Sequence, residues 1–366
     1  MLLGAALIVR DEAEHLARCL TSLADLVDEV VVVDTGSVDD SVRVAESLGA
    51  RVLHRPWDGD FSAARNLGLD AVTADWVLYI DADEHVRPMP RAELADALAD
   101  PGRSHLAHRV WLQARHGFTP YREYRIWRNR ADVRFHGVIH ESITRDLFRI
   151  SAAEDLAIGE VDLYLEHEGY EGDLSAKHRR NLPLLREQVL ADPTRVYLWG
   201  EIGRSHAGLG QIAEAEAAWE EGLARLRAHG PASSADCLAL VDLIALRAES
   251  GRPDAALVAE ADALFPDNAL ILWAGSIDAA ARQDHVEVVR RLDRLLDGDH
   301  PDLSGGRFAV DQRIVGHWGH HARGLARFHL GDHVGAAADF RAAERDAPDV
   351  EEYAVKRRLA EARARA

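Results

Sequence analysis

Four short apolar runs alternate with helical patterns over the first 85 residues, and this alternation limits the possible folds more than any other feature of the chain. Each run contains Val or Ile and has the length of a buried strand. Strands and helices in regular alternation predict an α/β domain with a parallel sheet. The four runs span residues 3–9, 29–33, 51–54 and 76–80.

Polar residues follow each predicted strand, and the fourth strand ends in Asp81-Ala82-Asp83-Glu84. In an open parallel sheet, ligands bind beyond the carboxyl ends of the strands. If the chain stays extended there, Asp81 and Asp83 point the same way while Ala82 points away. Two carboxylates on one side would then bind one divalent cation. Taken alone, the same motif also fits a surface turn with solvated acids.

After these acids the alternation changes. Residues 91–98 are helical, whereas residues 105–113, 122–128 and 161–165 alternate as strands. We expect them to extend the sheet and to form the far wall of a cleft. Ser62 is predicted to cap a helix that carries Arg65 in its first turn.

From residue 174 onward the pattern is helical and rich in Ala and Leu. Six positions recur at equal spacing, and a unit of about 34 residues with small residues and an aromatic knob resembles the tetratricopeptide repeat. Residues 235–266 and 268–296 look like two degenerate copies, residues 301–308 interrupt the array, and residues 350–365 form a charged end cap. The recurring positions are Trp199, Gly203, His206, Gly210, Ala215 and Trp219, matched by His320, Gly324, Arg327, Gly331, Ala336 and Phe340.

The net charge of the chain is −19, from 43 Lys and Arg against 62 Asp and Glu. This charge argues against a protein that coats nucleic acid or an anionic membrane. No apolar run approaches the ~20 residues of a membrane-spanning helix, and we interpret residues 1–9 as a strand rather than a signal peptide. With only Cys19 and Cys237 present, neither a disulfide framework nor a thiolate zinc site is supported, so we expect a cytoplasmic protein.

The strand-end motifs together resemble the family 2 glycosyltransferases of the GT-A fold, in particular the group that joins this domain to tetratricopeptide repeats and includes peptide S- and O-glycosyltransferases. Four motifs carry the resemblance in the same order. The resemblance implies a GT-A, Rossmann-like domain over residues 1–173, followed by an all-α tetratricopeptide-like domain over residues 174–366. The motifs are Arg10-Asp11-Glu12, Asp34-Thr35-Gly36-Ser37, Trp57 with Asp60-Phe61 and Ala64-Arg65-Asn66, and Asp81-Ala82-Asp83-Glu84.

The resemblance implies a set of residues for the nucleotide sugar. Asp34 could accept from uracil or ribose, although a carboxylate there could equally cap a helix. Arg65 suits a phosphate or Asp81, with a surface salt bridge as the alternative. Asp81 would contact ribose or support the metal, which Asp83 would bind directly. The full donor set is Arg10, Asp11, Asp34, Arg65, Asp81 and Asp83.

A second cluster, residues 135–141, resembles the acceptor-side loop of the same group. Inversion at the sugar needs a carboxylate that takes the acceptor proton, and Glu141 is our choice for this base. Glu141 could instead orient His140, and Glu84 and Asp132 are the reserve candidates. Glu84 and Trp127 are also candidates for acceptor contact or support.

The resemblance also implies a divalent metal, Mn²⁺ or Mg²⁺. Residues 166–170 are similar to a later histidine segment of the family, where a histidine joins the acid on the metal. His167 is therefore a candidate ligand, with His140 as its competitor. Trp111, Tyr121, Tyr124 and Trp127 could stack on a substrate, but aromatic residues at strand spacing favour packing within the sheet.

These expectations combine into a metal-dependent, inverting transfer of a hexose from a UDP-sugar to a hydroxyl or thiol. Repeat arrays offer concave surfaces for extended peptides, so we expect a peptide or protein acceptor. A small natural-product acceptor is the alternative within the same chemistry, and the repeats could instead form a homodimer. From another class, the chain could be a noncatalytic repeat scaffold with a degenerate transferase domain.

Overall fold

The computed structural model describes residues 2–100, 102, 104–168, 174–300, 303 and 308–366. It divides into two compact units, residues 1–116 with 120–174 and residues 117–119 with 175–366. The predicted loop over residues 301–308 lies mostly outside the described residues, as do Gly169 and Tyr170 of the predicted histidine segment.

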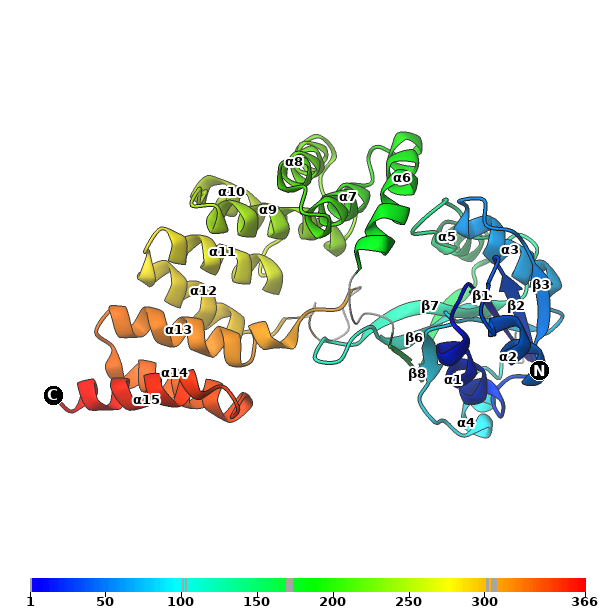
Figure 1. The fold of residues 1–366 in the computed structure, drawn as a ribbon, viewed down its shortest axis with the longest axis horizontal. Coiled ribbons are helices and arrows are strands. Elements are labelled where there is room, and N and C mark those ends of the chain that lie inside the picture. Colours follow the sequence, from blue (N-terminus) through cyan, green and yellow to red (C-terminus); the bar gives the residue numbers. More distant parts are fainter. Residues whose placement is uncertain (1, 101, 103, 169–173, 301–302, 304–307) are drawn as a thin grey trace. The chain divides into compact units, whose positions relative to one another are not determined.

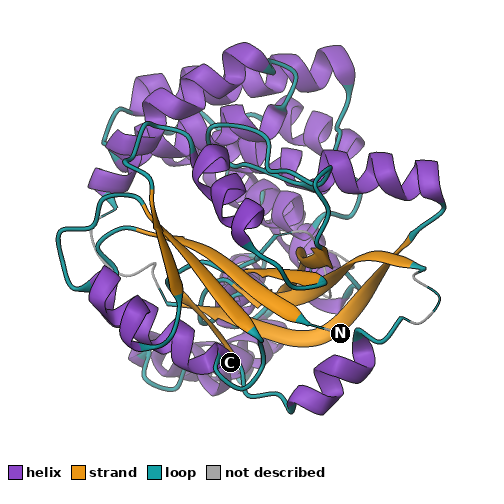
Figure 2. Ribbon diagram, turned by 90° about the vertical axis from the view of Figure 1, so that its right-hand side faces the viewer, coloured by secondary structure: helices purple, strands orange, loops and turns teal. Residues whose placement is uncertain are grey.

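Unit 1 is built on one eight-stranded sheet, which Figure 2 shows as a continuous twisted surface. The strand order is β3-β2-β1-β4-β7-β6-β8-β5. Strands β1 to β4 run parallel, as predicted, and β7 pairs antiparallel to β4 to begin the extension. The strands are β1 (Leu3–Val9), β2 (Glu29–Asp34), β3 (Arg51–His54), β4 (Trp76–Tyr79), β5 (Glu84–Val86), β6 (His105–Gln113), β7 (Tyr121–Arg128) and β8 (Ala157–His167).

Helices pack on both faces of this sheet. Alternation along β1 directs Leu3, Leu7 and Val9 into one apolar cluster and Ala6 into the other. The first cluster also contains the buried faces of α1 and α4, and the second contains those of α3 and α5. The helices of unit 1 are α1 (Ala13–Leu23), α2 (Ser41–Ser47), α3 (Phe61–Ala71), α4 (Arg91–Ala97) and α5 (Thr144–Glu154).

The predicted cap of α3 is wrong by two residues. Asp60, not Ser62, is the N-cap, and its carboxylate accepts the backbone N–H of Ala63 at 2.9 Å. Ser62 lies inside the first turn and donates its hydroxyl to the Gly137 carbonyl at 2.6 Å. The earlier start of the helix keeps Arg65 near its N-terminal end.

Unit 2 contains helices α6 to α15 in its described part, coloured green to red in Figure 1. Two of the predicted repeat positions carry the expected close packing, because a Cβ on Gly203 would collide with the Trp219 ring and one on Gly324 would lie 2.8 Å from Phe340. The helices are α6 (Ser175–Ala191), α7 (Val196–Gly208), α8 (Ile212–His229), α9 (Cys237–Glu249), α10 (Ala255–Leu264), α11 (Ala269–Ala281), α12 (His285–Asp297), α13 (His317–His329), α14 (His333–Asp346) and α15 (Glu351–Ala364), with short 3₁₀ turns at Ser234–Asp236 and Gln312–Ile314.

A short segment from the first half of the chain completes unit 2. Thr119 donates its backbone N–H to the Val310 carbonyl at 2.8 Å, and the Val310 N–H returns to the Thr119 hydroxyl at 2.9 Å. Phe118 and Asp311 form an isolated antiparallel bridge beside them.

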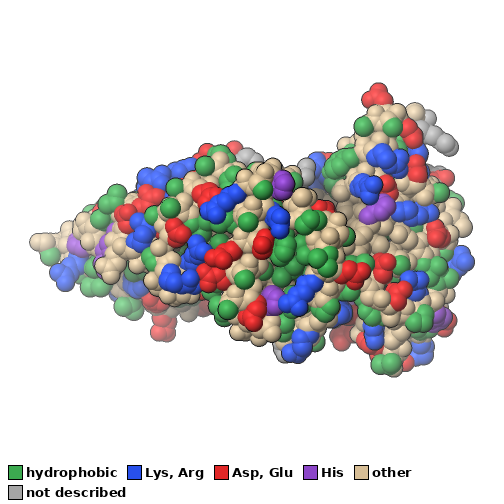
Figure 3. Space-filling model, turned by 90° about the horizontal axis from the view of Figure 1, so that it is seen from above, with side chains coloured by type: hydrophobic (Ala, Val, Ile, Leu, Met, Phe, Trp, Pro, Cys, Tyr) green, Lys and Arg blue, Asp and Glu red, His purple; other side chains and the backbone are tan. Residues whose placement is uncertain are grey.

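Acidic and basic side chains are intermingled over the face shown in Figure 3, which is consistent with the numerous ion pairs of both units. Cys19 and Cys237 are both buried and free. Over the described ranges, no helix has the length and apolar character needed to cross a membrane.

Candidate active site

The acidic motif is a tight turn between β4 and β5. The Glu84 N–H donates to the Asp81 carbonyl at 3.0 Å, and the Asp81 N–H donates to Glu84 Oε2 at 2.8 Å. Strand β4 ends at Tyr79, so the side-chain alternation predicted for an extended chain does not continue through these residues. The interpretation of Asp81 and Asp83 as two parallel ligands on an extended strand is therefore wrong.

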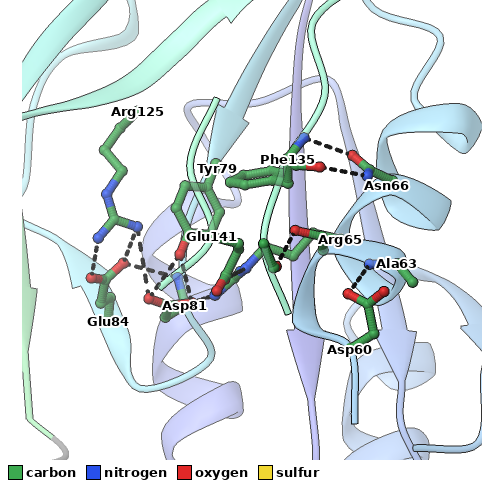
Figure 4. A network of polar contacts seen from close by, with 12 residues as sticks. Asp60, Ala63, Arg65, Asn66, Tyr79, Asp81, Glu84, Arg125, Phe135 and Glu141 are labelled. Carbon is green, nitrogen blue, oxygen red and sulfur yellow. Dashed lines mark hydrogen bonds and ion pairs between the residues drawn. The ribbon is translucent and has the colours of Figure 1, made fainter. Parts of the chain in front are cut away.

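Asp81 is held by cationic and hydroxyl partners. Its Oδ1 accepts from Arg65 Nη2 at 2.8 Å and from the Tyr79 hydroxyl at 3.2 Å, and its Oδ2 lies 3.8 Å from Arg125 Nη1 (Figure 4). Burial on its own would raise the pKa of Asp81, but the charges of Arg65 and Arg125 outweigh it and lower that pKa. The protein thus fixes Asp81 as a carboxylate in one orientation.

Asp83 faces His167, one of the two predicted histidines. The distance from Asp83 Oδ2 to His167 Nε2 is 3.1 Å, and the side chains are 27% and 12% exposed. Strands β5 and β8 create this contact, because their antiparallel pairing places His167 opposite Glu84. A carboxylate oxygen beside an imidazole nitrogen is a donor set that suits Mn²⁺, and the carboxylate also suits Mg²⁺.

A metal at this position would use few protein ligands. Over the described residues there is no group of three or more His, Cys, Asp and Glu side chains arranged to hold a metal. Asp83 and His167 would therefore supply two ligands to such a metal. His140, the competing candidate, lies beside Glu141 in a loop and has a left-handed φ of +48°.

The loop that carries Glu141 is closed on itself. His136 and Ser142 exchange two backbone hydrogen bonds of 3.1 Å. The loop is also attached to α3. Asn66 Nδ2 donates to the Phe135 carbonyl at 3.0 Å, and Asn66 Oδ1 accepts the Phe135 N–H at 2.9 Å. The acceptor-side loop and the first turns of α3 are therefore one connected structure.

Arg65 links this loop to the acidic turn. Its Nε donates to Glu141 and its Nη2 to Asp81, while its side chain and that of Glu141 are each only 9% exposed. The alternative of an ordinary surface salt bridge for Arg65 is therefore wrong. The guanidinium lies 4.3 Å from the centre of the Tyr79 ring, and its Nη1 is buried with no hydrogen-bond partner in the described structure.

Glu84 and Trp127 support the site and do not line it. Glu84 is 2% exposed and binds Arg125 through both oxygens at 2.8 and 3.1 Å. Burial raises the pKa of Glu84, although the Arg125 charge opposes this shift. Trp127 is 1% exposed and packs against Phe135 and Tyr79, so direct acceptor contact by either residue is wrong. Asp132, the other reserve base, is bound by Arg130 at 2.8 and 3.0 Å.

Asp34, a predicted donor residue, shapes the loop after β2. Asp34 is 5% exposed and accepts the N–H groups of Gly36 at 3.2 Å and Ser37 at 3.0 Å. Burial opposes ionisation, but these bonds and His54 hold the pKa of Asp34 below its usual value. Asp34 does not cap the next helix, whose N-cap residue is Asp40.

The first predicted motif, Arg10-Asp11-Glu12, contacts the same loop after β2. Asp11 Oδ1 accepts the Val38 N–H at 2.7 Å, and Asp11 has a left-handed φ of +54°. Arg10 is half-exposed, with its Nε 3.9 Å from Asp11. Sequence reasoning missed His54, whose Nδ1 lies 3.4 Å from Asp34 Oδ2. The parallel register of β2 and β3, which pairs these two residues, was the available signal.

This domain is similar to a known protein family. Residues 5–156 match the model of glycosyl transferase family 2. Residues 5–156 thus form a family 2 glycosyltransferase domain. The mixed sheet with its parallel N-terminal half and the helical repeats after it agree with the GT-A fold and the tetratricopeptide-like array expected from the sequence.

Curated relatives extend the likeness beyond this domain. A TPR repeat-containing protein of Synechococcus elongatus is 36% identical over 70% of this chain and 66% of its own length. The SPbeta prophage-derived glycosyltransferase SunS of Bacillus subtilis is 26% identical over 51% of this chain and 45% of its own length. The matched part is thus less than two thirds of either relative.

Solved structures show weaker likenesses. Staphylococcus aureus TarS 1-349 is 16% identical, with a TM-score of 0.35, over 80% of this chain and 91% of that one. Glucosyl-3-phosphoglycerate synthase from Mycobacterium tuberculosis, in complex with Mn²⁺ and UDP-glucose, is 19% identical, with a TM-score of 0.38, over 50% of this chain and 77% of that one. At these TM-scores neither structure assigns a role to a residue of this chain.

Proposed function

We propose that this chain transfers a hexose from a UDP-sugar to a hydroxyl or thiol of a peptide or protein acceptor. The transfer is metal-dependent, with Mn²⁺ or Mg²⁺, and inverts the configuration at the sugar. The family 2 domain supports sugar transfer in general. The observation that supports the metal-dependent form is the Asp83–His167 pair of 3.1 Å, next to the partly buried Asp81 carboxylate.

The donor half of the site would bind the nucleotide sugar through its diphosphate and ribose. A cation held by Asp83 and His167 would neutralise the diphosphate and so stabilise it as the leaving group. Asp81 retains 29% exposure, and we assign it a hydrogen bond from the ribose. Asp34, at the carboxyl end of β2, would accept from ribose or base, with His54 beside it.

The acceptor half would depend on Glu141. In the transfer step the acceptor oxygen or sulfur forms a bond to C1 of the sugar as the bond from C1 to the diphosphate oxygen breaks. Glu141 takes the proton of the acceptor group, and the electron pair of the broken bond leaves with the diphosphate. Arg65 holds the Glu141 carboxylate in one orientation through its Nε.

A donor-binding assay tests this function. Thermal unfolding is measured with Mn²⁺ alone, with UDP alone and with both together. The proposal predicts a stabilisation by both that exceeds the sum of the two single effects, because each ligand binds the folded state and the metal bridges them. No shift beyond that of Mn²⁺ alone would overturn the proposal in favour of a noncatalytic repeat scaffold. A hydrolysis panel of UDP-hexoses then identifies the sugar.

The acceptor class is tested separately. The repeat array supports a peptide or protein acceptor, since stacked helix pairs form extended surfaces. The full chain is incubated with a radiolabelled UDP-hexose and a cell extract, which is then separated by size. Label in the peptide and protein fraction, removed by protease, is the expected result. Label confined to small molecules would contradict a peptide acceptor and support a small-molecule one.

A further inference from the structure

Beside the acidic turn, the Tyr79 ring is enclosed by two buried cations. The guanidinium carbon of Arg65 and that of Arg125 each lie 4.3 Å from the ring centre. Arg125 is only 3% exposed and Arg65 only 9%. Such buried charges are weak contributors to stability, because removing them from water costs about as much as their pairing returns. Their presence therefore indicates that they hold neighbouring side chains and backbone in position.

The backbone directs Arg125 to this place. Strands β6 and β7 pair His108 with Ile126 and Arg109 with Tyr124, so Arg125 has no partner on β6. This irregularity is a β-bulge with Arg125 as the additional residue. Bulges redirect a side chain and are enriched next to active sites. Here the redirected side chain reaches the turn that carries Asp81 and Asp83.

Arg125 acts on this turn through Glu84. Its two terminal nitrogens bind both Glu84 oxygens, at 2.8 and 3.1 Å, and its Nε binds Glu123 at 3.0 Å. Glu84 Oε2 in turn accepts the Asp81 N–H at 2.8 Å (Figure 4). The turn is therefore closed by a carboxylate whose own position depends on Arg125.

We propose that Arg125 is a positioning residue of the transfer reaction, which fixes the Asp81–Glu84 turn through Glu84 and thereby sets where Asp83 presents its carboxylate to the metal. This inference rests on the proposed function. It assigns no contact between Arg125 and a substrate. Its effect on the metal is indirect, as for residues that hold metal ligands in orientation.

Calorimetric titration of Mn²⁺ into the full chain with saturating UDP tests the proposal. Arg125→Met should weaken Mn²⁺ binding by about 10–100-fold, the range found when partners of metal ligands are removed. Arg125→Lys keeps the charge but cannot bind both Glu84 oxygens in the same way. We expect its Mn²⁺ affinity to fall between that of the wild type and that of the methionine variant.

Arg128→Met is the matched control. Arg128 lies on the same strand, stacks 4.6 Å from the Trp76 ring and binds Asp100 at 2.8 Å, but it does not contact the acidic turn. The control should lose thermal stability while keeping wild-type Mn²⁺ affinity.

The outcomes separate the two proposals. Absence of UDP-dependent Mn²⁺ binding in the wild type would reject the proposed function itself. With wild-type binding present, unchanged Mn²⁺ affinity in Arg125→Lys, or equal losses in Arg125→Met and Arg128→Met, would overturn the role of Arg125. If the methionine variant does not fold, the lysine variant decides alone.

Discussion

Asp83 and His167 meet across two strands that are far apart in the sequence, with 3.1 Å between Oδ2 and Nε2. Strand β5 starts directly after Asp83, and β8 ends at His167. Because both residues are placed by backbone pairing, the two side chains are brought together before any ligand binds. In the proposed function, this contact belongs to the donor half of the candidate site.

Replacing either residue should remove metal binding. We expect Asp83→Ala and His167→Ala each to weaken Mn²⁺ binding in the presence of UDP by more than about a hundredfold, since loss of outer partners alone costs about 10–100-fold. Transfer or donor hydrolysis should fall in parallel. Asp96→Ala, at an exposed position of α4, is the control. Full activity of Asp83→Ala in the presence of a chelator would rule out Asp83 as a ligand.

The role of Glu141 is separable from that of its neighbours by kinetics. Glu141→Gln keeps the shape of the side chain but cannot take a proton. We expect kcat to fall by about 10²–10⁴-fold with little change in KM for the UDP-sugar. Asp132→Asn, which alters the reserve base, should leave kcat within a few-fold of wild type. A fall in kcat for Asp132→Asn with none for Glu141→Gln would exchange the two assignments.

The buried position of Arg65 predicts a large loss of stability on its removal. Arg65→Met leaves the Asp81 and Glu141 carboxylates without their shared cation, so the free energy of unfolding should fall by about 3–5 kcal/mol. Urea denaturation measures this free energy of unfolding. Arg43→Met removes an exposed ion pair with Asp40 and should cause no measurable change. Equal losses in the free energy of unfolding for Arg65→Met and Arg43→Met would show that burial of the ion pair does not determine the loss.

His108 should make the free energy of unfolding depend on pH. Its ring is buried with both nitrogens lacking hydrogen-bond partners in the described structure, and burial lowers its pKa from 6.5 to about 4. As the pH falls, His108 of the unfolded chain therefore binds a proton near pH 6.5, whereas His108 of the folded chain binds one only near pH 4.

The stability that His108 contributes is thus fully present above pH 6.5 and is lost as the pH falls toward about 4. The loss in the free energy of unfolding reaches about 3 kcal/mol at most, because the pKa of His108 falls from 6.5 to about 4 on folding and each pKa unit corresponds to about 1.36 kcal/mol. His108→Leu should remove this part of the pH dependence in urea denaturation between pH 4 and 7. His116→Leu, at an exposed position, should retain it. An unchanged slope in His108→Leu would contradict the assignment.

Two glycines of α7 should respond in opposite directions to alanine. At Gly203 a Cβ would collide with the Trp219 ring, so Gly203→Ala should lower stability by about 1–3 kcal/mol. At Gly200 the nearest atom to a Cβ is 3.7 Å away, and Gly200→Ala should raise stability by about 0.5–1 kcal/mol because alanine favours helix. Thermal unfolding of the two variants is the measurement, and a shift of the same sign in both would reject this packing.

The sequence predicted the parallel half of the sheet because each of its strands is a short apolar run followed by polar residues. It did not predict β5, whose three residues follow the acids at once, or α5, which lies between two loops. Short elements of this kind take their conformation from their neighbours in the fold, and local pattern alone does not determine them. The turn at Asp81–Glu84 was given only as the alternative to an extended chain, for the same reason.

In the candidate site, too, some residues could be predicted from local sequence pattern and others could not. Asp34, Asp81 and Asp83 were found because they follow buried strands. The partners that hold them were harder to predict, since Arg125 depends on a bulge and His54 on the register of two strands. Such relations between strands leave little trace in a single sequence.

The attachment of residues 135–141 to α3 limits how a protein of this design can acquire new acceptors. Asn66 and Ser62 hold this loop, and Arg65 from the same helical turn holds Asp81. Under the proposed function, a change in this part of α3 therefore affects the binding of both substrates at once. Evolution toward a different acceptor would proceed more readily through surface positions away from this helix, leaving the sugar donor unchanged.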